Sequence, residues 1–425
     1  QAFRKASSSV PAYKDILNKH GTEAKEVKTL SDFQSRVPIT DKKMTFLSYR
    51  LADLCVDGNL DNVLLLLPSS GFSGGYSYGV ITSADAVAGV ALLDEGLKRT
   101  FDLGGKPLIV NTLGMGVTVQ TNFPSIQTGT RSDIVLETLA RLRSDFTSFV
   151  LIGDPLFIKQ VIDEGADKNY KWGEYKIFFI LGGDWFPESF RQYLMEKTGY
   201  DRSNILSSMG IAEIGLNVLF ESPISADMRV FLAENPAFLK SLGFSSTPLL
   251  FHYDPSRIFI ETISDPLLGS QLVFTTLDTE RKLPLIRYLS KDQGVILDKQ
   301  FLGLLPPEAQ EKYTPLMPLV AMQGRSDAFV SSAGEERLYT AEVLENLFKD
   351  AALATFITGQ FFLRAEEGFI VELQLRQGVE GDSLGDKFKN ILQNLNKTSV
   401  RILPRAYEKF PHQMAIDYQR KPKRI

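Results

Sequence analysis

The sequence predicts an α/β protein whose large N-terminal domain is built on a doubly wound, parallel sheet. Short apolar runs alternate with segments of helical periodicity from residue 62 to about residue 213, a pattern typical of helix-covered parallel sheets. From about Leu249 the chain becomes β-rich with turns between the strands, which indicates an antiparallel sheet or small barrel. We therefore expect a large N-terminal domain over 1–323, with the β-rich subdomain at about 249–323, and a small mobile α+β C-terminal domain over 324–425.

The composition fits a globular protein and disfavours several classes of function. The 425 residues are 44% hydrophobic and 23% charged, which provides enough apolar material for a large core. The net charge of −4 gives no basic field for nucleic acid, and the apolar runs are too short to span a membrane. Cys55 is the one cysteine, so neither a disulfide framework nor a cysteine metal cluster can form within the chain. We expect a cytoplasmic protein with no membrane or nucleic-acid partner.

The first 213 residues are predicted to carry the helices and strands of the parallel sheet. Residues 1–50 are polar and helical, with breaks at Pro11 and Pro38, and Pro187 suits the first position of a helix. Strands are expected where runs of Val, Ile, Leu and Phe end at Gly, Pro or polar residues. The expected strands are 62–67, 107–111, 148–152, 176–181 and 205–207, and the expected helices are 84–101, 133–143, a helix beginning at 155, and 187–198.

The second half is predicted from alternating β-branched and aromatic residues, followed by a return of helical periodicity. In the β-rich subdomain we expect strands at 257–263, 271–276 and 284–288. In the C-terminal domain we expect helices at 341–348 and 382–394, and strands near 354–358, 369–375 and 400–403.

Three loops follow strands of the predicted parallel sheet and are rich in glycine, hydroxyl or acidic residues. They are 69–75, 182–184 and 208–213. In doubly wound sheets, ligands bind beyond the carboxyl ends of the strands, so the three loops could converge on one site. Glycines and hydroxyls after a strand can surround a phosphate, although 69–75 lacks the Gly-Lys-Ser/Thr of a Walker loop. The alternative for each loop is an ordinary solvated turn.

The order of these motifs resembles the adenylate-forming superfamily, and most closely its phenylacetate–coenzyme A ligase branch, over nearly the whole chain. The strongest block runs from His252 to Asp292, where the family pattern is "H-x-x-D … F-x-x-E-x-I-D-P", "G-E-L-V-F-T-T-L" and "L-P-x-I-R-Y-R-T-x-D". This chain reads HYD at 252–254, FIE at 259–261, SDP at 264–266, QLVFTTL at 271–277, LPLIRY at 283–288, and Asp292. The segments at 69–75, 182–184, 209–213, 324–327 and 420–424 are similar to shorter family motifs.

The resemblance implies activation of a carboxylic acid by ATP and Mg²⁺, in which the carboxylate attacks the α-phosphorus. Its phosphate-binding positions correspond to Ser69, Ser70, Gly71, Ser73 and Gly74, and its metal-site residues to Glu213 and Ser70. The adenine slot corresponds to Gly183, Asp184, Ser208, Met209 and Gly210, and the ribose acceptor to Asp292. Arg325 would lie over ribose or phosphate, Asp327 would be the hinge, and Lys421 would reach the α-phosphate. His252 is a catalytic candidate, with a structural hydrogen bond as its alternative.

Several positions depart from the family pattern. Met209 offers no aromatic ring to adenine, Ala212 lacks a hydroxyl, and Glu221-Ser222 stand where relatives have a zinc-binding cysteine. Glu335 and Glu336 replace residues near the coenzyme A entrance, so this polyanion is doubtful as an acceptor, and a carrier-protein pantetheine arm, an amine or an acyl-acceptor enzyme are the alternatives. The rival interpretation is a non-catalytic member of the same fold that binds nucleotide or acid as a partner protein.

The acid substrate and the oligomeric state are less well determined. The uncharged, glycine-containing stretch 113–130 stands where the family has its acyl pocket, and Met115, Gly116 and Trp185 are the pocket candidates for a flat aromatic or fatty acid. The alternative for the aromatic residue is a place in the core. A homodimer is one of the oligomeric states that the sequence leaves open.

Overall fold

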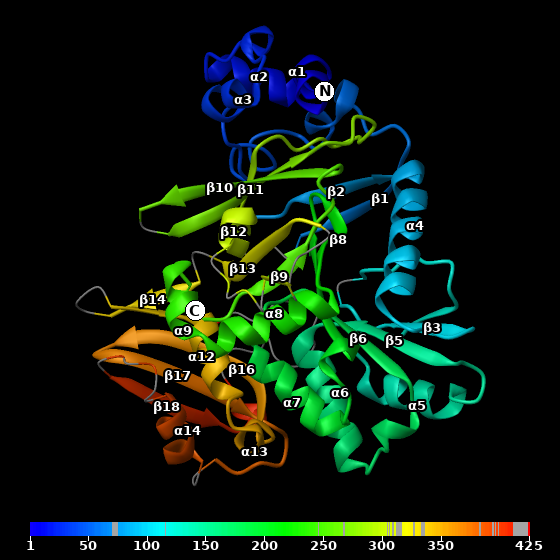
Figure 1. Cartoon of the computed structure of the whole chain (residues 1–425), viewed down its shortest axis with the longest axis vertical. Coiled ribbons are helices and arrows are strands. Elements are labelled where there is room, and N and C mark those ends of the chain that lie inside the picture. The colour runs from blue at the N-terminus through cyan, green and yellow to red at the C-terminus, as the bar shows by residue number, and fades with distance from the viewer. Residues whose placement is uncertain are drawn as a thin grey trace. The chain divides into compact units, whose positions relative to one another are not determined.

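The computed structural model describes most of the chain and divides it into two compact units. The described residues are 1–69, 75–114, 116–244, 246–266, 268–303, 305, 307, 310–311, 317–325, 328–332, 336–381, 384–392, 395, 397, 399–410 and 424–425. Unit 1 contains Gln1–Leu93, Met209–Phe220 and Phe251–Met322, and unit 2 contains Asp94–Ser208, Glu221–Leu250 and Gln323–Ile425. Figure 1 labels the elements of both units.

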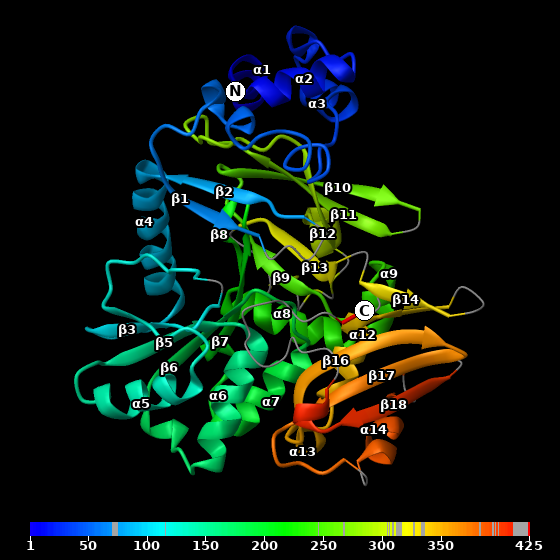
Figure 2. The same ribbon diagram turned by 180° about the vertical axis from the view of Figure 1, so that it is seen from behind.

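Unit 1 begins with three helices, α1 (Ala2–Ser9), α2 (Pro11–Lys19) and α3 (Leu30–Arg36). Pro11 occupies the first turn of α2, where its missing N–H costs nothing. Helix α3 starts at a capping box in which Thr29 and Asp32 exchange hydrogen bonds between side chain and backbone. The buried faces of α1 and α2 form a hydrophobic cluster with Ile286, and the partly buried Phe33 of α3 packs against it. Both views show the blue helices beside β10 and β11 (Figures 1 and 2).

The first strand, β1 (Val63–Pro68), forms where it was predicted but does not belong to the parallel sheet. It pairs antiparallel with β2 (Tyr78–Thr82) in a separate two-stranded sheet. The prediction of a parallel strand at 62–67 is therefore wrong in its pairing, because the chain returns directly through β2. At Gly79 of β2, a Cβ would lie 1.9 Å from the Ala212 carbonyl oxygen, so only glycine allows this close approach.

The β-rich part of unit 1 is antiparallel, as predicted. Its strands are β10 (Ile258–Asp265), β11 (Gly269–Thr276) and β12 (Tyr288–Leu297), paired in that order. The prediction of a strand at 284–288 is wrong except for its last residue, since Arg287 has a left-handed φ of 47° and the ladder starts at Tyr288. Further elements are β8 (Gly215–Phe220), β9 (Leu249–His252), α10 (Lys299–Gly303) and β13 (Leu319–Arg325).

Unit 2 contains the predicted parallel strands. Strand β7 (Ile205–Ile211) pairs with β6 (Ile177–Gly182), and the ladder continues through β5 (Ser148–Gly153), β3 (Pro107–Asn111) and the short β4 (Ser125–Gln127). Helices α5 (Ser132–Leu142), α6 (Pro155–Asp167) and α7 (Glu188–Thr198) gather on one side of β3, β5 and β6 in both views (Figures 1 and 2). The chain also forms α4 (Ser83–Thr100), α8 (Pro223–Glu234) and α9 (Pro236–Ser241).

Described residues from the C-terminal part of unit 2 pack on α6 and α7. The three-stranded sheet has the order β16 (Ile357–Glu366), β17 (Gly368–Leu375), β18 (Val400–Arg405), and α14 (Gly385–Leu392) belongs to the same segment. The buried Lys159 ammonium of α6 donates to the Ile357 carbonyl at 2.7 Å, and the Phe190 and Phe348 rings meet at 4.8 Å. The remaining elements are β14 (Phe329–Ser331), β15 (Arg337–Tyr339), α12 (Thr340–Leu347) and α13 (Ala351–Ala354).

These elements confirm the predicted α/β class. One detail near the C-terminus differs: the predicted strand at 354–358 is instead the end of α13 followed by the start of β16, because Asp350 caps a short helix there. The domain boundary at 323/324 stays a prediction. Within the described residues, no helix combines the length and the apolar character that crossing a membrane requires.

Candidate active site

Glu213 lies in the tight turn that joins β7 to β8. The prediction of a loop over 208–213 is wrong in extent, because β7 continues through Met209 and Gly210 and the turn occupies 212–214. The Ile214 N–H donates to the Ile211 carbonyl at 2.8 Å, and the Arg281 guanidinium donates to the Glu213 carbonyl at 3.1 Å and to the Ile214 carbonyl. This half-buried arginine holds the backbone of the turn, so the Glu213 side chain starts from a fixed position.

The Glu213 carboxylate is buried and accepts two hydrogen bonds on one oxygen. The Ser77 hydroxyl donates to Oε1 at 2.5 Å and the Tyr288 hydroxyl donates to the same atom at 2.9 Å. Burial, and then the Glu213 charge, raise the pKa of Tyr288 above its usual range, so this hydroxyl remains a donor at neutral pH. Three segments distant in the sequence therefore meet at one carboxylate.

A lysine and a second serine complete this cluster. The Lys42 ammonium lies 3.4 Å from the Ser69 hydroxyl oxygen and 4.0 Å from Glu213 Oε1. The Ser77 N–H donates to the Ser69 hydroxyl at 3.0 Å, and the Ser69 N–H donates to the Ser77 carbonyl at 2.9 Å. The segment between these two serines contains the predicted phosphate loop. We call Lys42, Ser69, Ser77, Glu213 and Tyr288 the Glu213 cluster.

The donor set of the Glu213 cluster fits a magnesium ion that arrives with a phosphate ligand. Mg²⁺ usually keeps several waters and takes one or two carboxylates plus substrate phosphates. Every hydrogen bond that the carboxylate accepts from a described residue goes to Oε1, which leaves Oε2 for a cation or its water. Across the described part of the chain, no group of three or more His, Cys, Asp and Glu is arranged to hold a metal by itself.

Asp292 lies four residues after Tyr288 on β12. Lys291 immediately before it has φ = 67°, and Arg287 immediately before Tyr288 has φ = 47°, so two non-glycine residues are left-handed within this short stretch. Such strained positions often occur at functional sites. The Asp292 carboxylate is close enough for its charge to contribute to the raised pKa of Tyr288. The sequence-predicted Asp292 and Glu213 are therefore electrostatic neighbours of one tyrosine.

In unit 2, the predicted adenine-slot residues lie at the carboxyl ends of adjacent parallel strands. Gly182 of β6 is in register with Ser208 of β7, and Gly183 follows with φ = 98°, a conformation that favours glycine. The Asp184 carboxylate accepts from the Trp185 N–H at 2.9 Å and pairs with the Arg424 guanidinium at 2.9 Å. Gly183, Asp184 and Ser208 are thus brought together where doubly wound sheets bind ligands.

A second carboxylate, Asp154, lies near Asp184. Burial and the charge of Asp184 raise the pKa of Asp154 to about 6, while Arg424 opposes the shift. Asp154 also caps α6 by accepting from the Leu156 and Phe157 N–H groups at 2.9 and 3.2 Å. Two carboxylates and one arginine, from three separate segments of unit 2, therefore interact electrostatically here.

The other predicted site residues are less closely tied to these two groups. Trp185 is buried, and a Cβ at Gly324 would lie 3.8 Å from its Cβ, so the tryptophan packs beside the backbone that leads to the half-buried Arg325. Gly116 has φ = 68° with open space around it. His252 is buried on β9 against the Phe220 ring at 5.9 Å, and burial lowers its pKa while a hydrogen bond to the Met317 backbone opposes this. These contacts suit the structural alternative for His252.

Some predicted residues lie outside the described part of the chain. These are Ser70, Gly71, Ser73, Gly74, Met115, Asp327, Glu335 and Lys421.

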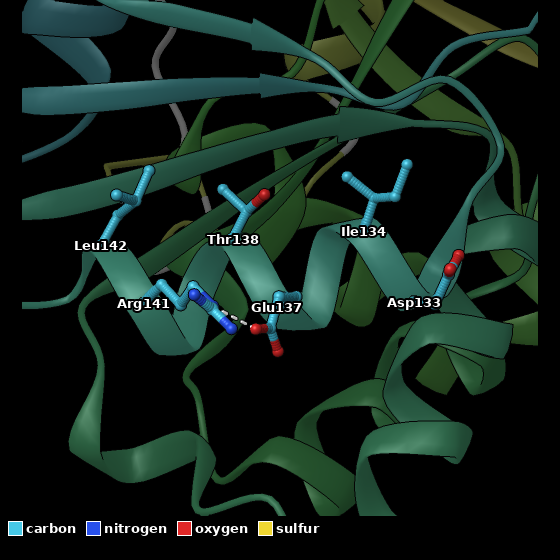
Figure 3. Close-up of a pocket in the computed structure, with 6 residues that line it drawn as sticks. All are labelled: Asp133, Ile134, Glu137, Thr138, Arg141 and Leu142. Carbon is cyan, nitrogen blue, oxygen red and sulfur yellow. Dashed lines mark hydrogen bonds and ion pairs between the residues drawn. The ribbon is translucent and has the colours of Figure 1, made fainter.

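A hollow of about 340 Å³ on helix α5 contains none of the predicted site residues. All six residues that line it come from this helix, and Ile134, Thr138 and Leu142 point to the same side (Figure 3). Glu137 and Arg141 form an ion pair there. The hollow lies beside side chains that are four residues apart on one helix. Its polar side chains do not converge on a common point, as they do in ligand sites.

Sequence reasoning missed Lys42, Ser77, Tyr288 and Arg424 as members of these groups. Lys42 follows Asp41, whose carboxylate accepts from the Met44 N–H at 2.8 Å. An aspartate in this position indicates a turn with a fixed backbone, but it does not indicate which residues the Lys42 side chain contacts. Tyr288 was recognised only as part of the motif block 252–292, although acids of that block stand on both sides of it, Glu261 before and Asp292 after. Arg424 was considered only as one residue of the basic segment 420–424.

Comparison with solved structures gives matches over the full chain at low identity. A 2-hydroxyisobutyryl-CoA ligase in the postadenylation state, in complex with an acyl-AMP, matches with a TM-score of 0.70 and 14% identity over 100% of this chain and 87% of that one. The same enzyme in the thioesterification state, with acyl-AMP and CoA, gives a TM-score of 0.56 with 14% identity over 96% and 85%.

Two further matches have TM-scores just above 0.5. An amide bond synthetase from Marinactinospora thermotolerans has a TM-score of 0.52 and 12% identity over 86% of this chain and 68% of that one. A chain from a study of fatty acyl-adenylate ligases from E. coli and L. pneumophila has a TM-score of 0.51 and 14% identity over 87% and 69%. No protein-family model and no curated protein sequence matches the chain. The chain therefore has the fold of the adenylate-forming ligases.

Proposed function

We propose that the protein uses ATP to activate a carboxylic acid as an acyl-adenylate and transfers the acyl group to a thiol or amine. The observation that carries this proposal is the Glu213 cluster: a buried carboxylate with two hydroxyl donors and one ammonium, on the fold of the adenylate-forming ligases. A single metal-binding carboxylate beside a phosphate-binding segment is what a Mg-nucleotide needs, because the phosphates supply further ligands.

In this proposal the Glu213 cluster binds magnesium and the departing phosphates. Glu213 holds the cation through Oε2 or an intervening water, and Tyr288 and Ser77 keep the carboxylate oriented by their bonds to Oε1. Lys42 and Ser69 offer a positive charge and a hydroxyl to pyrophosphate oxygens. Magnesium supplies charge neutralisation when bound, and the protein residues fix the geometry in which the acid carboxylate attacks the α-phosphorus.

The remaining nucleotide contacts follow the predicted roles. Gly183, Asp184 and Ser208 line the adenine slot with Met209 and Gly210, and Asp292 accepts the ribose hydroxyls. Arg325 contacts ribose or phosphate near the Asp327 hinge, and Lys421 brings its charge to the α-phosphate. His252 keeps a structural role in this proposal, in view of its contacts with Phe220 and the Met317 backbone.

The finer proposals are the branch and the acyl acceptor. The motifs over 252–292 support a divergent member of the phenylacetate–coenzyme A ligase branch, acting on an aromatic or fatty acid in a pocket near Met115, Gly116 and Trp185. The solved neighbours include both a CoA ligase and an amide bond synthetase, so thiol and amine acceptors both have precedents on this fold. Glu335 and Glu336 favour an acceptor other than coenzyme A, because two carboxylates near its entrance would repel the polyanion.

A second candidate function is nucleotide or acid binding without catalysis. Met209 and Ala212 favour it, since neither an aromatic ring nor a hydroxyl is present at these positions and the Ala212 carbonyl is packed against Gly79. The buried Glu213 carboxylate opposes it, because both of its hydrogen bonds from described residues go to Oε1, and a buried acid with no ligand to bind costs stability.

The test is acid-dependent pyrophosphate release. Purified protein, Mg-ATP and a panel of aromatic and fatty acids are mixed, and pyrophosphate is measured with and without EDTA. Adenylation predicts release that needs both an acid and a divalent cation. Tight nucleotide binding with no acid-dependent release from any panel member would favour the non-catalytic alternative.

A further inference from the structure

Arg424, the penultimate residue of the chain, is buried and held by three contacts within unit 2. Its carbonyl accepts from the Leu363 N–H of β16 at 2.7 Å, its guanidinium lies 5.4 Å from the centre of the Phe361 ring, and Nη2 lies 2.9 Å from Asp184 Oδ2. Only 9% of the residue is exposed. These three contacts fix the position of Arg424 within unit 2.

Asp184 joins Arg424 to the loop after β6. Its Oδ1 accepts from the Trp185 N–H at 2.9 Å, which fixes the loop, while Oδ2 faces Arg424. The neighbouring Gly183 has φ = 98° and leads directly from the end of β6. One carboxylate therefore connects the proposed adenine-binding loop with Arg424.

Arg424 also balances the charge of this loop. Asp154 and Asp184 repel each other, and Arg424 is the cation that offsets the repulsion. Without it, two carboxylates would face each other at the carboxyl end of β6, and the loop would be expected to open. The conformation of Gly183 and Asp184 therefore depends on the position of Arg424.

The guanidinium retains donor capacity in this buried position. Neither Nε nor Nη2 of Arg424 has an aligned hydrogen bond to a described residue, although Nη2 is ion-paired with Asp184. Burying an arginine without saturating its donors is costly, so the contact is not an efficient means of stabilising the fold. The contact is better explained if the position of Arg424 matters for the reaction.

We infer that Arg424 is a positioning residue for adenylation: its ion pair with Asp184 holds the segment that carries Arg424 on the loop after β6. The inference rests on the proposed function. Arg424 acts through Asp184 and through the backbone contact with Leu363, and it need not touch the substrate. Holding this segment in place should affect the rate of the chemical step more than the binding of ATP.

The experiment is a double-mutant cycle on acid-dependent pyrophosphate release by the full chain, with Arg424→Ala, Asp184→Asn and the double variant. Arg401→Ala is the matched control, because Arg401 is an exposed arginine of the same unit, 3.5 Å from an exposed Glu366 carboxylate. Arg424→Ala should lower kcat by at least about tenfold, with the KM for ATP changed by less than about threefold, as expected for loss of one partner of a buried charge pair. The double variant should be no slower than the slower single variant.

Two further readouts separate a positioning role from a merely structural one. Arg424→Lys keeps the charge and should recover part of kcat. Hydrogen exchange at the Leu363 amide should speed up in Arg424→Ala and Asp184→Asn, because this segment is released, while the thermal unfolding midpoint confirms folded protein. If the wild type is active, either of two results would overturn the inference. One is a kcat of Arg424→Ala equal to that of wild type, and the other is a double variant in which the losses of the two single variants multiply. A wild type that releases no pyrophosphate with any acid would instead defeat the proposed function.

Discussion

The Tyr288 hydroxyl donates a 2.9 Å hydrogen bond to the Glu213 carboxylate, joining the start of β12 to the turn after β7. The same oxygen accepts from Ser77, and the Lys42 ammonium lies 4.0 Å away. A carboxylate held this way has a fixed orientation and one oxygen left to bind a cation. This relationship is the physical basis for the proposal that Glu213 binds magnesium.

Glu213→Gln should abolish most acid-dependent pyrophosphate release while keeping the fold. The amide has the same size and can still accept from Tyr288 and Ser77, but it removes the anionic ligand. We expect a loss of at least about a hundredfold in kcat, the range seen when a preorganised electrostatic group is removed. Glu280→Gln, at a carboxylate that is 85% exposed in the same unit, is the control. Activity within a few-fold of wild type would remove Glu213 from the metal site.

Asp292→Asn should weaken ATP binding more than acid binding. A carboxylate that accepts ribose hydroxyls makes charge-assisted hydrogen bonds, each worth about 1.5–3 kcal/mol, so affinity should fall about tenfold or more. Isothermal titration calorimetry with ATP and AMP measures the change directly. Asp278→Asn, at an exposed position of the same unit, should leave the affinity unchanged. Equal ATP affinity in wild type and Asp292→Asn would give Asp292 a structural role.

Asp154→Asn should stabilise the protein above pH 6. Because folding raises the pKa of this carboxyl from 3.8 to about 6, the folded state keeps a proton that the unfolded chain has lost, and stability falls as pH rises between these values. Asparagine keeps the oxygen that caps α6 and carries no charge.

Since part of the Asp154 residue still faces solvent, the expected gain in unfolding free energy at pH 8 is about 1–2 kcal/mol. Urea titrations at pH 8 and pH 4 measure it, with the exposed Asp145→Asn as control, and the gain should be absent at pH 4. A variant less stable than wild type at pH 8 would show that the carboxylate is ionised and well paired.

The acceptor prediction concerns the second half-reaction. After the adenylate has formed, hydroxylamine or a carrier-protein pantetheine arm should take the acyl group faster than coenzyme A, because Glu335 and Glu336 are proposed to stand near the coenzyme A entrance and would repel its phosphates. Mass spectrometry of the acyl products in a competition assay gives the ratio. Glu335→Gln/Glu336→Gln should shift the ratio toward coenzyme A. Rapid acyl-coenzyme A formation that saturates at micromolar coenzyme A would return the protein to the ordinary ligases.

The parallel strands could be predicted because their apolar runs are local signals: 176–181 became β6 and 148–152 became β5 almost to the residue. The pairing of β1 could not, since an apolar run does not say whether its neighbour is the next strand or a distant one. Lys42 and Arg424 were missed for the same reason. Their partners, Ser69 and Asp184, are 27 and 240 residues away, and no spacing rule connects them.

The most direct test of adenylation follows an oxygen atom. When the acid carboxylate attacks the α-phosphorus of ATP and the acyl group is later transferred, one carboxylate oxygen stays on AMP. With an ¹⁸O-labelled acid that supports pyrophosphate release and hydroxylamine as the acceptor, AMP from wild type should carry one ¹⁸O per turnover, and Glu213→Gln should form almost none. If AMP and acyl hydroxamate form in equal amounts but the AMP carries no ¹⁸O, the reaction does not pass through an acyl-adenylate, and the central claim is contradicted.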